Sequence, residues 1–211
     1  MREKKKEIPE GVIRRMPRYY RKLRELLEQG VDHISSGELA RIMDVTASQI
    51  RQDLNHFGGF GQYGYGYDIE FLKNRIEQIL GLDKTYGMVI FGAGNLGSAM
   101  AKHTPSIPLP HHVHALFDND PAVIGTKVGP YTVLDTADFA TYIAENPAEI
   151  AVLTLPETQA QQVADLAVQG GIRAIWNFSP ADIQISDPKV VIENVHLSNS
   201  LMVLTYHLST Q

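Results

Sequence analysis

The sequence predicts an α/β protein in which a small, mainly helical head precedes a larger, mostly parallel sheet. Three observations support this fold class. Amphipathic helical patterns fill most of residues 1–80, a strand-turn-helix pattern with spaced glycines begins at Tyr86, and short apolar runs then alternate with helical patterns. We expect the head with a linker helix at 1–80, the sheet domain at 81–195 and a C-terminal helix at 196–211.

Composition narrows the possible chemistry. The 211 residues, 44% of them hydrophobic, suffice for one or two domains at roughly 100–200 residues each. The chain has no cysteine, which excludes disulfides, cysteine-ligated zinc and thiol nucleophiles, so redox sensing would need a bound cofactor. No apolar run approaches the roughly 20 residues of a membrane span, and no signal peptide is recognisable. We therefore expect a cytoplasmic protein.

Charge is distributed unevenly along the chain. Met1–Arg24 carries ten Lys or Arg against three Asp or Glu, a net +7, whereas Gly81–Gln211 carries five against twelve, a net −7. A basic arm on an acidic body suggests that one end meets a polyanion. For the first few residues, a solvated tail that contacts nothing is an equal alternative.

The first helix of the head is expected to begin at Pro17. Proline is favoured in the first turn, and Tyr20, Leu23 and Leu27 follow at helical spacing until Gly30 supplies a stop.

Two capping-box patterns then predict two short helices. Ser35–Glu38 opens a helix that ends near Asp44, and Thr46–Gln49 opens the next. The second helix places Ile50, Leu54 and Phe57 on one face. Its other face carries hydrogen-bonding side chains at i, i+3, i+4 and i+7: Ser48, Arg51, Gln52 and Asn55.

This pair fits a helix-turn-helix whose second helix enters the major groove of DNA. Arginine pairs with guanine and Asn or Gln with adenine, while Ser and Thr usually hold phosphates. The alternative is an ordinary amphipathic helix with a polar outer face. The predicted DNA-contacting residues of this region are Thr46, Ser48, Gln49, Arg51, Gln52 and Asn55.

A glycine-rich segment follows the second helix. Residues 58–67 alternate glycine with aromatic residues, as a tight hairpin does, and fit the wing of a winged helix. Gln62 and Tyr63 at its tip are expected to reach the DNA backbone or minor groove. A surface loop without a ligand is the alternative. Asp68 then begins a helix that ends at Gly81 and connects the two domains.

Three spaced glycines lie between the apolar run Tyr86–Phe91 and a helical segment. In this context Gly92 allows the tight turn, Gly94 lets a pyrophosphate approach the backbone, and Gly97 lets helix and strand pack closely. The amides at the helix N-terminus then hold phosphate charge. The pattern predicts a Rossmann-type dinucleotide site at Gly92, Ala93, Gly94, Asn95, Leu96 and Gly97.

The cofactor's ribose is expected to meet Asp118. This residue ends the next apolar run, His112–Phe117, and follows Gly97 by 21 residues. A carboxylate there favours NAD(H) over the 2′-phosphorylated cofactor. The alternative is that Asp118–Pro121 is only a turn.

The remaining pattern alternates as in a parallel sheet. We expect helices at Asp135–Glu145 and Glu157–Gln169, and strands at Ile150–Leu155, Ile172–Trp176 and Val190–Val195. Ligands of such sheets sit beyond the carboxyl ends of strands. Candidates to line the far half of the cofactor are Thr154, Pro156, Asn177, Phe178 and Pro180, although both segments also fit ordinary strand exits.

The last helix, Leu197–Leu208, is apolar on more than one side. Leu197, Leu201, Leu204 and Leu208 form one stripe, with Met202, Val203 and Tyr206 beside it. We infer that it packs into a second subunit, with burial in its own chain as the alternative. A homodimer also supplies the two recognition helices that a palindromic operator requires.

Three histidines cluster at His111, His112 and His114. They have no carboxylate or thiol companions at ligand spacing, so we expect no metal site.

The assembled motifs resemble the Rex family of bacterial redox-sensing transcriptional repressors, over nearly the whole chain and in the same order. The matching segments are Ile13–Tyr20, Ser48–Leu54, Phe57–Tyr67, Gly92–Gly97 and Asn177–Pro180. The resemblance implies a homodimer with an N-terminal winged helix, a Rossmann domain that binds NADH, and a C-terminal helix exchanged between subunits. It implies repression from an A/T-rich inverted repeat until NADH releases the protein, with NAD⁺ competing for the pocket.

Some positions depart from the family pattern. Gln62 and Tyr63 stand where some members carry a basic pair in the wing. Where some members link an arginine, a tyrosine and an acid, this chain has Arg21, His103 and His196. These three are switch candidates, but a carboxylate switch does not carry over to His196.

Two rival functions remain at this point. One is an NAD-dependent dehydrogenase, although some 130 residues are too few for a nucleotide fold plus a substrate domain, and no Tyr-x-x-x-Lys pair or placed general acid is evident. The other is a repressor that answers a different nucleotide. We expect no enzyme activity.

Overall fold

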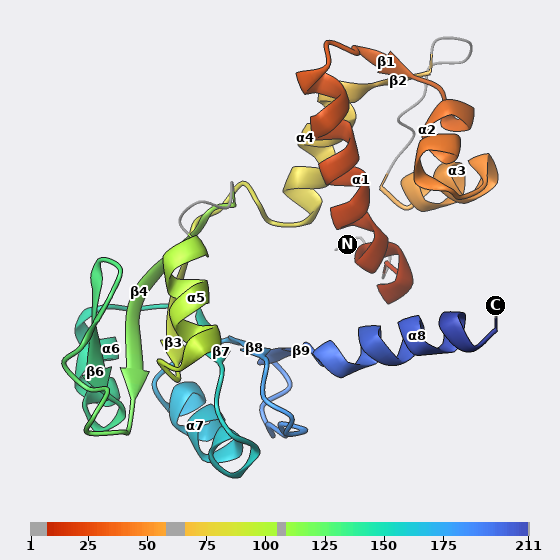
Figure 1. The fold of residues 1–211 in the computed structure, drawn as a ribbon. Coiled ribbons are helices and arrows are strands. Elements are labelled where there is room, and N and C mark those ends of the chain that lie inside the picture. The colour runs from red at the N-terminus through yellow and green to blue at the C-terminus, as the bar shows by residue number, and fades with distance from the viewer. Residues whose placement is uncertain (1–7, 58–65, 105–108, 211) are drawn as a thin grey trace. The chain divides into compact units, whose positions relative to one another are not determined.

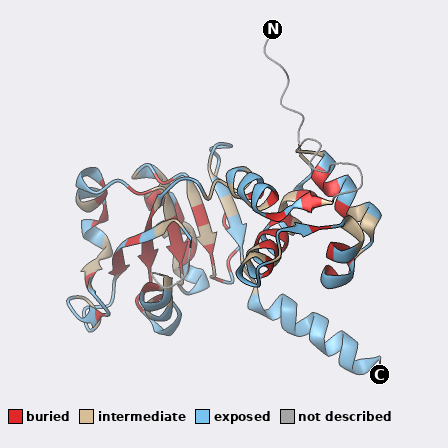
Figure 2. Ribbon diagram, turned by 90° about the horizontal axis from the view of Figure 1, so that it is seen from above, coloured by how far each residue is buried: buried red, intermediate tan, exposed pale blue. Residues whose placement is uncertain are grey.

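The computed structural model describes residues 8–57, 66–104 and 109–210. The chain divides into two compact units, Met1–Lys84 and Thr85–Gln211 (Figure 1). Each unit has its own core of buried apolar residues. In Figure 2 buried residues, in red, lie along the helices of the first unit and the strands of the second.

The first unit is a helical head with one short pair of strands. Its helices are α1 (Glu10–Glu28), α2 (Ser36–Met43), α3 (Ala47–Asn55) and α4 (Ile69–Ile79). Strand β1 (His33–Ile34) pairs antiparallel with β2 (Tyr67–Asp68). The strand β2 follows the glycine-rich segment and thus forms the described base of the expected wing, whose residues 58–65 lie outside the described ranges.

Capping residues set the helix boundaries in the head. Ser35 accepts a hydrogen bond from the Glu38 amide while the Glu38 carboxylate accepts one from the Ser35 amide, so the first expected capping box is present. Asp68 caps α4 by accepting a hydrogen bond from the Phe71 amide, at the helix start that the sequence predicts. The second box is wrong in part. Thr46 Oγ1 accepts from the Gln49 amide at 3.1 Å, but the Gln49 side chain bonds to Asp53 instead of returning to Thr46.

The expected start of the first helix at Pro17 is also wrong. Helix α1 begins at Glu10 and contains Pro17 in its interior. Proline inside a helix costs about 3 kcal/mol. The extra turns bury Val12 and Met16, which are 5% and 0% exposed, and burial of such side chains gives about 1.5–3 kcal/mol each. Tertiary packing therefore offsets the local cost.

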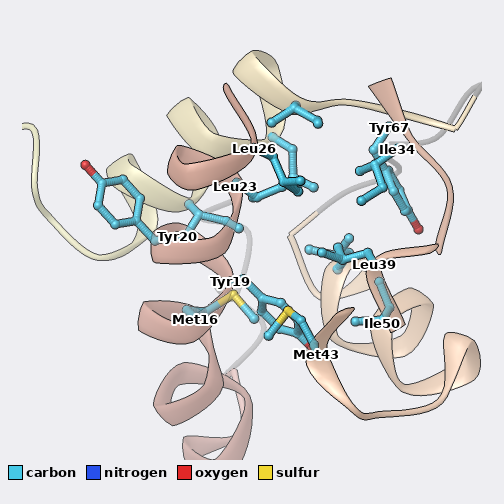
Figure 3. Close-up of a cluster of buried hydrophobic side chains, with 14 of the residues drawn as sticks. Met16, Tyr19, Tyr20, Leu23, Leu26, Ile34, Leu39, Met43, Ile50 and Tyr67 are labelled. Carbon is cyan, nitrogen blue, oxygen red and sulfur yellow. The ribbon is translucent and has the colours of Figure 1, made fainter. Parts of the chain in front are cut away.

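The core of the head lies where α1, α2, α3 and α4 meet. Tyr19 and Met16 of α1 point towards Met43 of α2 and Ile50 of α3, while Leu23 and Leu26 pack nearer to the paired strands (Figure 3). Helices α1 to α4, with the antiparallel pair of β1 and β2, match the winged-helix head that the sequence predicts.

The second unit contains a seven-stranded sheet. Its strands are β3 (Tyr86–Phe91), β4 (His111–Asp118), β5 (Lys127–Val128), β6 (Tyr131–Asp135), β7 (Ile150–Leu153), β8 (Ala174–Asn177) and β9 (Val191–Asn194), in the spatial order β5-β6-β4-β3-β7-β8-β9. All neighbouring pairs are parallel except β5 with β6. Leaving out β5, this is the 3-2-1-4-5-6 order of a doubly wound Rossmann sheet.

Helices cover the two faces of the sheet. On one face Phe139 and Ile143 of α6 (Phe139–Glu145) and the alanines of α7 (Glu157–Gln169) pack against Phe91 and Phe117. On the other, Ala101 of α5 (Asn95–His103) packs with neighbours from β3 and β4. The strand order reverses beside β3, between β4 and β7, and ligands bind at such a switch point.

Two features of this unit differ from the sequence prediction. The expected helix from Asp135 begins only at Phe139, because Asp135 ends β6 and caps a 3-10 turn at Thr136–Asp138. Strand β6 and its short partner β5 were not predicted from the sequence. Strand β6 is partly exposed and mixes polar with apolar side chains, so it lacks the continuous apolar run of a buried parallel strand.

The last helix, α8 (Leu197–Ser209), has no buried residue. It is pale blue along its length in Figure 2. Its leucines, Met202, Val203 and Tyr206 are all more than half exposed. Burial in its own chain, the alternative for this helix, is therefore not what the structure shows.

Candidate functional sites

The glycine loop lies at the carboxyl end of β3, at the switch point of the sheet. The Gly92 amide donates to the Phe117 carbonyl of β4 at 2.8 Å, and the Thr154 amide beyond β7 donates to the Phe91 carbonyl at 2.9 Å. The loop is thus held by both neighbours of β3, and its conformation depends on the sheet.

Two of the glycines are required by the closeness of neighbouring atoms. Gly92 has φ +97°, and a Cβ there would lie 2.6 Å from the Thr154 carbonyl oxygen. A Cβ on Gly97 would lie 1.9 Å from the Gly92 carbonyl oxygen. The turn and the close approach of helix to strand that the sequence predicts are therefore present in the backbone.

Gly94 is different because its Cβ position is open. No atom lies within 4 Å of a Cβ built there, and Gly94, Asn95 and Leu96 are exposed, while Gly92, Ala93 and Gly97 are buried. Gly94 is the N-cap of α5 and, because glycine has no side chain, makes no side-chain capping hydrogen bond. The first amides of a helix have no partner inside the helix and carry partial positive charge. This end of α5 is thus an open cradle suited to a phosphate group.

Asp118 lies directly beside the loop. Its Oδ2 accepts from the Ala93 amide at 2.7 Å, and its Oδ1 accepts from the amides of Asn119 and Asp120. A carboxylate has about four acceptor positions, so one remains for a hydroxyl donor such as a ribose. Asp118 is therefore bonded to the glycine loop. It also takes part in the turn that was the alternative interpretation of Asp118–Pro121.

Of the two predicted residues after β7, Thr154 contacts the glycine loop and Pro156 is exposed. Thr154 Oγ1 lies 3.0 Å from the Phe91 carbonyl oxygen and 2.8 Å from that of Gly92, both acceptors for its hydroxyl. Pro156 is exposed and caps α7 at the same edge of the sheet. Thr154 therefore stabilises the turn, and Pro156 stands at the rim.

The segment after β8 forms an internal network. Asn177 is fully buried, and its amide donates to the Ala181 carbonyl and to Asn194 Oδ1, while its own oxygen accepts from Ser179. Phe178 packs edge-on against Trp176 at 4.7 Å, and Pro180 is exposed. Only the last two have surface that a ligand at this edge could share.

A polar hollow of about 490 Å³ lies next to Asp118, between the segments after β4 and β6 and helix α7. Asn119 and Gln159 line it and approach each other at 3.4 Å. The sequence analysis did not single out either residue, because neither belongs to a spaced motif.

A second, apolar cavity of about 330 Å³ lies towards the amino ends of the strands, the opposite edge from the glycine loop. Its lining includes Met88, His111, Ile150, Trp176, Val191 and Glu193. Burial and the neighbouring His112 lower the pKa of His111. This cavity is separate from the candidate dinucleotide site.

In the head, α3 presents the polar face that its spacing predicts. Ser48, Arg51, Gln52 and Asn55 are exposed, and Thr46 at the N-cap is exposed as well. Arg51 donates to Ser36 Oγ of α2 at 3.0 Å, which holds its guanidinium at the surface. Gln49 is only half-exposed and its amide turns to Asp53. Gln62 and Tyr63 lie outside the described residues.

The buried partner of Gln49 was missed from the sequence. Asp53 is fully buried and accepts hydrogen bonds from Arg15, Tyr19 and Gln49. Its place on the apolar side of α3, one residue before Leu54, was the only available signal. An acidic residue at such a position indicates a buried partner elsewhere in the chain.

The three switch candidates fall in both units. Arg21 of α1 is exposed in the head. In the second unit His103 ends α5 and is exposed, and His196 is the half-exposed N-cap of α8.

Two further observations concern ligands and membranes. Within residues 8–57, 66–104 and 109–210, no group of three or more His, Asp or Glu side chains is arranged to hold a metal ion. In the same ranges no helix has the length and apolarity needed to cross a bilayer.

The two units define a class of protein: a winged-helix head joined to a Rossmann-type nucleotide domain. The family model described as "Putative DNA-binding protein N-terminus" matches residues 7–55, and the one described as "CoA binding domain" matches residues 83–181. The first covers α1 to α3, and the second covers the sheet from β3 past β8.

Curated relatives identify the family. The redox-sensing transcriptional repressor Rex of Thermoanaerobacter pseudethanolicus is 50% identical over 208 residues, which are 99% of this chain and 92% of that protein. The Rex of Clostridium botulinum strain Hall is 47% identical over 203 residues, 96% of each chain. This chain therefore belongs to the Rex family of redox-sensing transcriptional repressors.

Solved structures agree with this assignment. The crystal structure of RSP, in complex with β-NAD⁺ and operator DNA, has a TM-score of 0.91 and 48% identity, and covers 97% of this chain and 94% of that one. RSP in complex with β-NADH gives a TM-score of 0.88 at 46% identity, covering 97% and 96%. RSP is itself a Rex-family repressor.

Proposed function

We propose that this chain is a homodimeric repressor that binds an A/T-rich inverted-repeat operator and is released when NADH binds, with NAD⁺ competing for the same site. One observation carries the proposal. A single chain combines the exposed polar face of α3 with an open glycine cradle at the switch point of a Rossmann sheet. The similar repressor RSP has been crystallised with β-NAD⁺ and operator DNA and with β-NADH, which supports both halves.

The cradle fits a dinucleotide by its shape and charge. Gly94 leaves room for a pyrophosphate, which the amides of Asn95 and Leu96 would hold at the start of α5. Asp118, with one acceptor position left, would bind the adenosine ribose and repel a 2′-phosphate. The exposed Pro156 and Pro180 and the half-buried Phe178 would border the far half, while Thr154 and Asn177 would act by holding the adjacent backbone.

On the DNA side, Arg51, Gln52 and Asn55 would read base edges, while Thr46 and Ser48 at the start of α3 would hold phosphates. We also keep Gln62 and Tyr63 as wing contacts, by hydrogen bonding in place of the basic pair of some relatives. A repressor works where its operator is, so we place the protein in the cytoplasm.

Dimerisation rests on α8. Its apolar side chains are exposed around the whole helix, with Leu197 at 69% and Leu204 at 55%. A contiguous apolar surface of this kind marks an interaction site. We propose that α8 packs into a second subunit, which would bring two recognition helices to half-sites roughly 34–36 Å apart.

Ligand and DNA would act on one equilibrium between two dimer shapes. The two sheet domains would close on each other when NADH is bound, and the recognition helices would leave the half-site spacing. A ligand shifts such an equilibrium only by its different affinity for the two shapes. NADH and NAD⁺ differ only at the nicotinamide ring, so that ring must be sensed. Arg21, His103 and His196 are our candidates to transmit the signal.

Two alternatives differ in measurable ways. The description of the second family model names coenzyme A, and a repressor that answered that nucleotide would bind operator without a response to NADH. The relatives are repressors rather than enzymes, and we propose that this chain does not turn NADH over. NADH oxidation with a small carbonyl substrate, without operator binding, would favour a dehydrogenase.

A gel shift on the operator duplex of the RSP complex tests the proposal, with NADH and NAD⁺ titrated separately. We expect a complex of one dimer per inverted repeat that NADH dissolves at lower concentration than NAD⁺. A complex that persists at saturating NADH, or the absence of any complex, would contradict the proposal.

A further inference from the structure

The recognition helix α3 contains a fully buried charged side chain, Asp53, at 0% exposure. It lies between the buried Ile50 and Leu54, on the side of α3 that faces the core of the head. A buried carboxylate costs several kcal/mol unless its oxygens are well paired. Both oxygens of Asp53 therefore require hydrogen-bond partners.

Four hydrogen bonds converge on the two oxygens of Asp53. Arg15 donates from Nε to Oδ2 and from Nη2 to Oδ1, both at 2.7 Å. Tyr19 donates from its hydroxyl to Oδ2 at 2.8 Å, and Gln49 donates from Nε2 to Oδ1 at 2.7 Å. A carboxylate has about four acceptor positions, so all the acceptor positions of Asp53 are occupied.

The donors come from two helices. Arg15 and Tyr19 are one turn apart on α1, and Gln49 and Asp53 are one turn apart on α3. Figure 3 shows Tyr19 directed from α1 towards the α2 and α3 side of the core. The cluster thus ties one turn of α1 to one turn of the recognition helix.

The protonation states strengthen this tie. Burial alone would raise the pKa of Asp53, but the hydrogen bonds from Arg15, Tyr19 and Gln49 outweigh it and lower that pKa below its ordinary value. The hydrogen bond to Asp53 raises the pKa of the Arg15 guanidinium. Asp53 is therefore charged and Arg15 protonated at neutral pH, as the two-pronged pair requires.

Such a pair restricts how α3 can lie. A guanidinium fork matches a carboxylate in one plane, and a slip of one residue along a helix moves a side chain by 1.5 Å and rotates it by about 100°. The outer face of α3, with Arg51, Gln52 and Asn55, rotates as one body with Asp53. The cluster thus determines which direction that outer face points.

We propose that Arg15, Tyr19, Gln49 and Asp53 form a positioning cluster for the recognition helix, and that Gln49 acts on operator affinity through Asp53 rather than by reading a base. The inference rests on the proposed function and deepens it, because it separates two glutamines that the sequence grouped together. Gln49 is half-buried and donates to Asp53, whereas Gln52 is exposed.

The two glutamines provide a matched comparison. Gln49→Ala and Gln52→Ala are made in the full chain, and operator affinity is measured on the RSP operator duplex and on copies that each carry one substituted base pair. We expect Gln49→Ala to weaken binding by one common factor across the panel, roughly threefold to tenfold, the loss typical of one hydrogen bond. Gln52→Ala should instead change discrimination at one base pair.

A second set of variants tests whether Gln49 acts through Asp53. Asp53→Asn should weaken binding about tenfold, and adding Gln49→Ala to it should cost little more, since residues of one network are not additive. Adding Gln52→Ala to Asp53→Asn should instead lower operator affinity by the product of the two separate losses. Tyr19→Phe keeps the packed ring and removes one donor to Asp53. If Asp53→Asn does not fold, Tyr19→Phe replaces it in the double-mutant comparison with Gln49→Ala. The fraction of each variant that binds NADH, through the second unit, is measured and used to correct the concentration of active protein.

Three outcomes separate the ideas. Uniform losses for Gln49→Ala that vanish in the Asp53→Asn background, or that are smaller in the Tyr19→Phe background than in the wild-type protein, support the positioning cluster. A loss confined to one base pair, undiminished in those backgrounds, would show that Gln49 reads DNA and overturn the inference alone. A wild-type protein that binds none of the duplexes would overturn the proposed function and the inference with it.

Discussion

An alanine at position 97 would collide with the backbone of the glycine loop. Its Cβ would lie 1.9 Å from the Gly92 carbonyl oxygen and 2.7 Å from Thr154 Oγ1, so helix or loop must move by roughly 1.5 Å to restore ordinary contact. Overpacking costs about 1–3 kcal/mol, and a backbone collision belongs at the upper end. At about 2–4 °C per kcal/mol, we expect Gly97→Ala to lower the melting temperature by roughly 6–12 °C.

Gly94→Ala is the matched control, because it adds the same methyl group to the same loop without a collision. Nothing lies within 4 Å of the new Cβ, and the φ of −64° suits any residue. We expect its stability to change by less than about 0.5 kcal/mol. The methyl group would nevertheless occupy the space a pyrophosphate needs, so NADH affinity should fall at least about tenfold, or 1.4 kcal/mol.

Calorimetry gives the melting temperatures, and NADH titration followed by fluorescence gives the affinities. The two variants should separate the two properties, since Gly97→Ala loses stability and Gly94→Ala loses only binding. Wild-type NADH affinity in Gly94→Ala would refute the reasoning that the loop cradles the pyrophosphate. Wild-type stability in Gly97→Ala would refute the packing argument.

Four further predictions address the other parts of the molecule. Arg51→Ala should weaken operator binding roughly 5- to 150-fold by fluorescence anisotropy, with NADH affinity unchanged; equal binding would remove Arg51 from the interface. Asp118→Ser should narrow the preference for NADH over NADPH about tenfold, and an unchanged ratio in paired titrations would argue against a ribose contact. Leu204→Asp should turn the dimer into a monomer in analytical ultracentrifugation, because it puts a charge on the apolar surface of α8; a persistent dimer would place the interface elsewhere. The stabilisation that Asp53 gives relative to Asp53→Asn should be present at neutral pH and shrink as pH falls below about 4, because its pKa is lowered in the folded state; a melting-temperature difference that stays constant down to pH 3 would contradict this.

Short-range patterns account for the parts of the fold that the sequence predicts well. The glycine spacing, the strand before it and Asp118 at the end of the next strand are local signals with one geometric meaning, and the structure places them together at one edge of the sheet. The capping box at Ser35 is equally local.

The parts that sequence analysis missed depend on contacts between distant residues. Pro17 stays inside α1 because Val12 and Met16 are buried against helices further along the chain. The role of Asp53 requires Arg15, which is 38 residues away. No local pattern in either segment predicts that pairing. The polar outer face of α3 could therefore be predicted from the sequence, but the contacts of Asp53 on its inner face could not.

If NADH and operator DNA act on one equilibrium of the dimer, each must weaken the binding of the other, and this coupling can be measured in both directions. Operator affinity is measured with and without saturating NADH, and NADH affinity with and without saturating operator. Thermodynamic linkage requires the two factors to be equal, so we expect each ligand to weaken the binding of the other by the same factor. Affinities that are independent of the other ligand in both titrations would contradict a shared equilibrium.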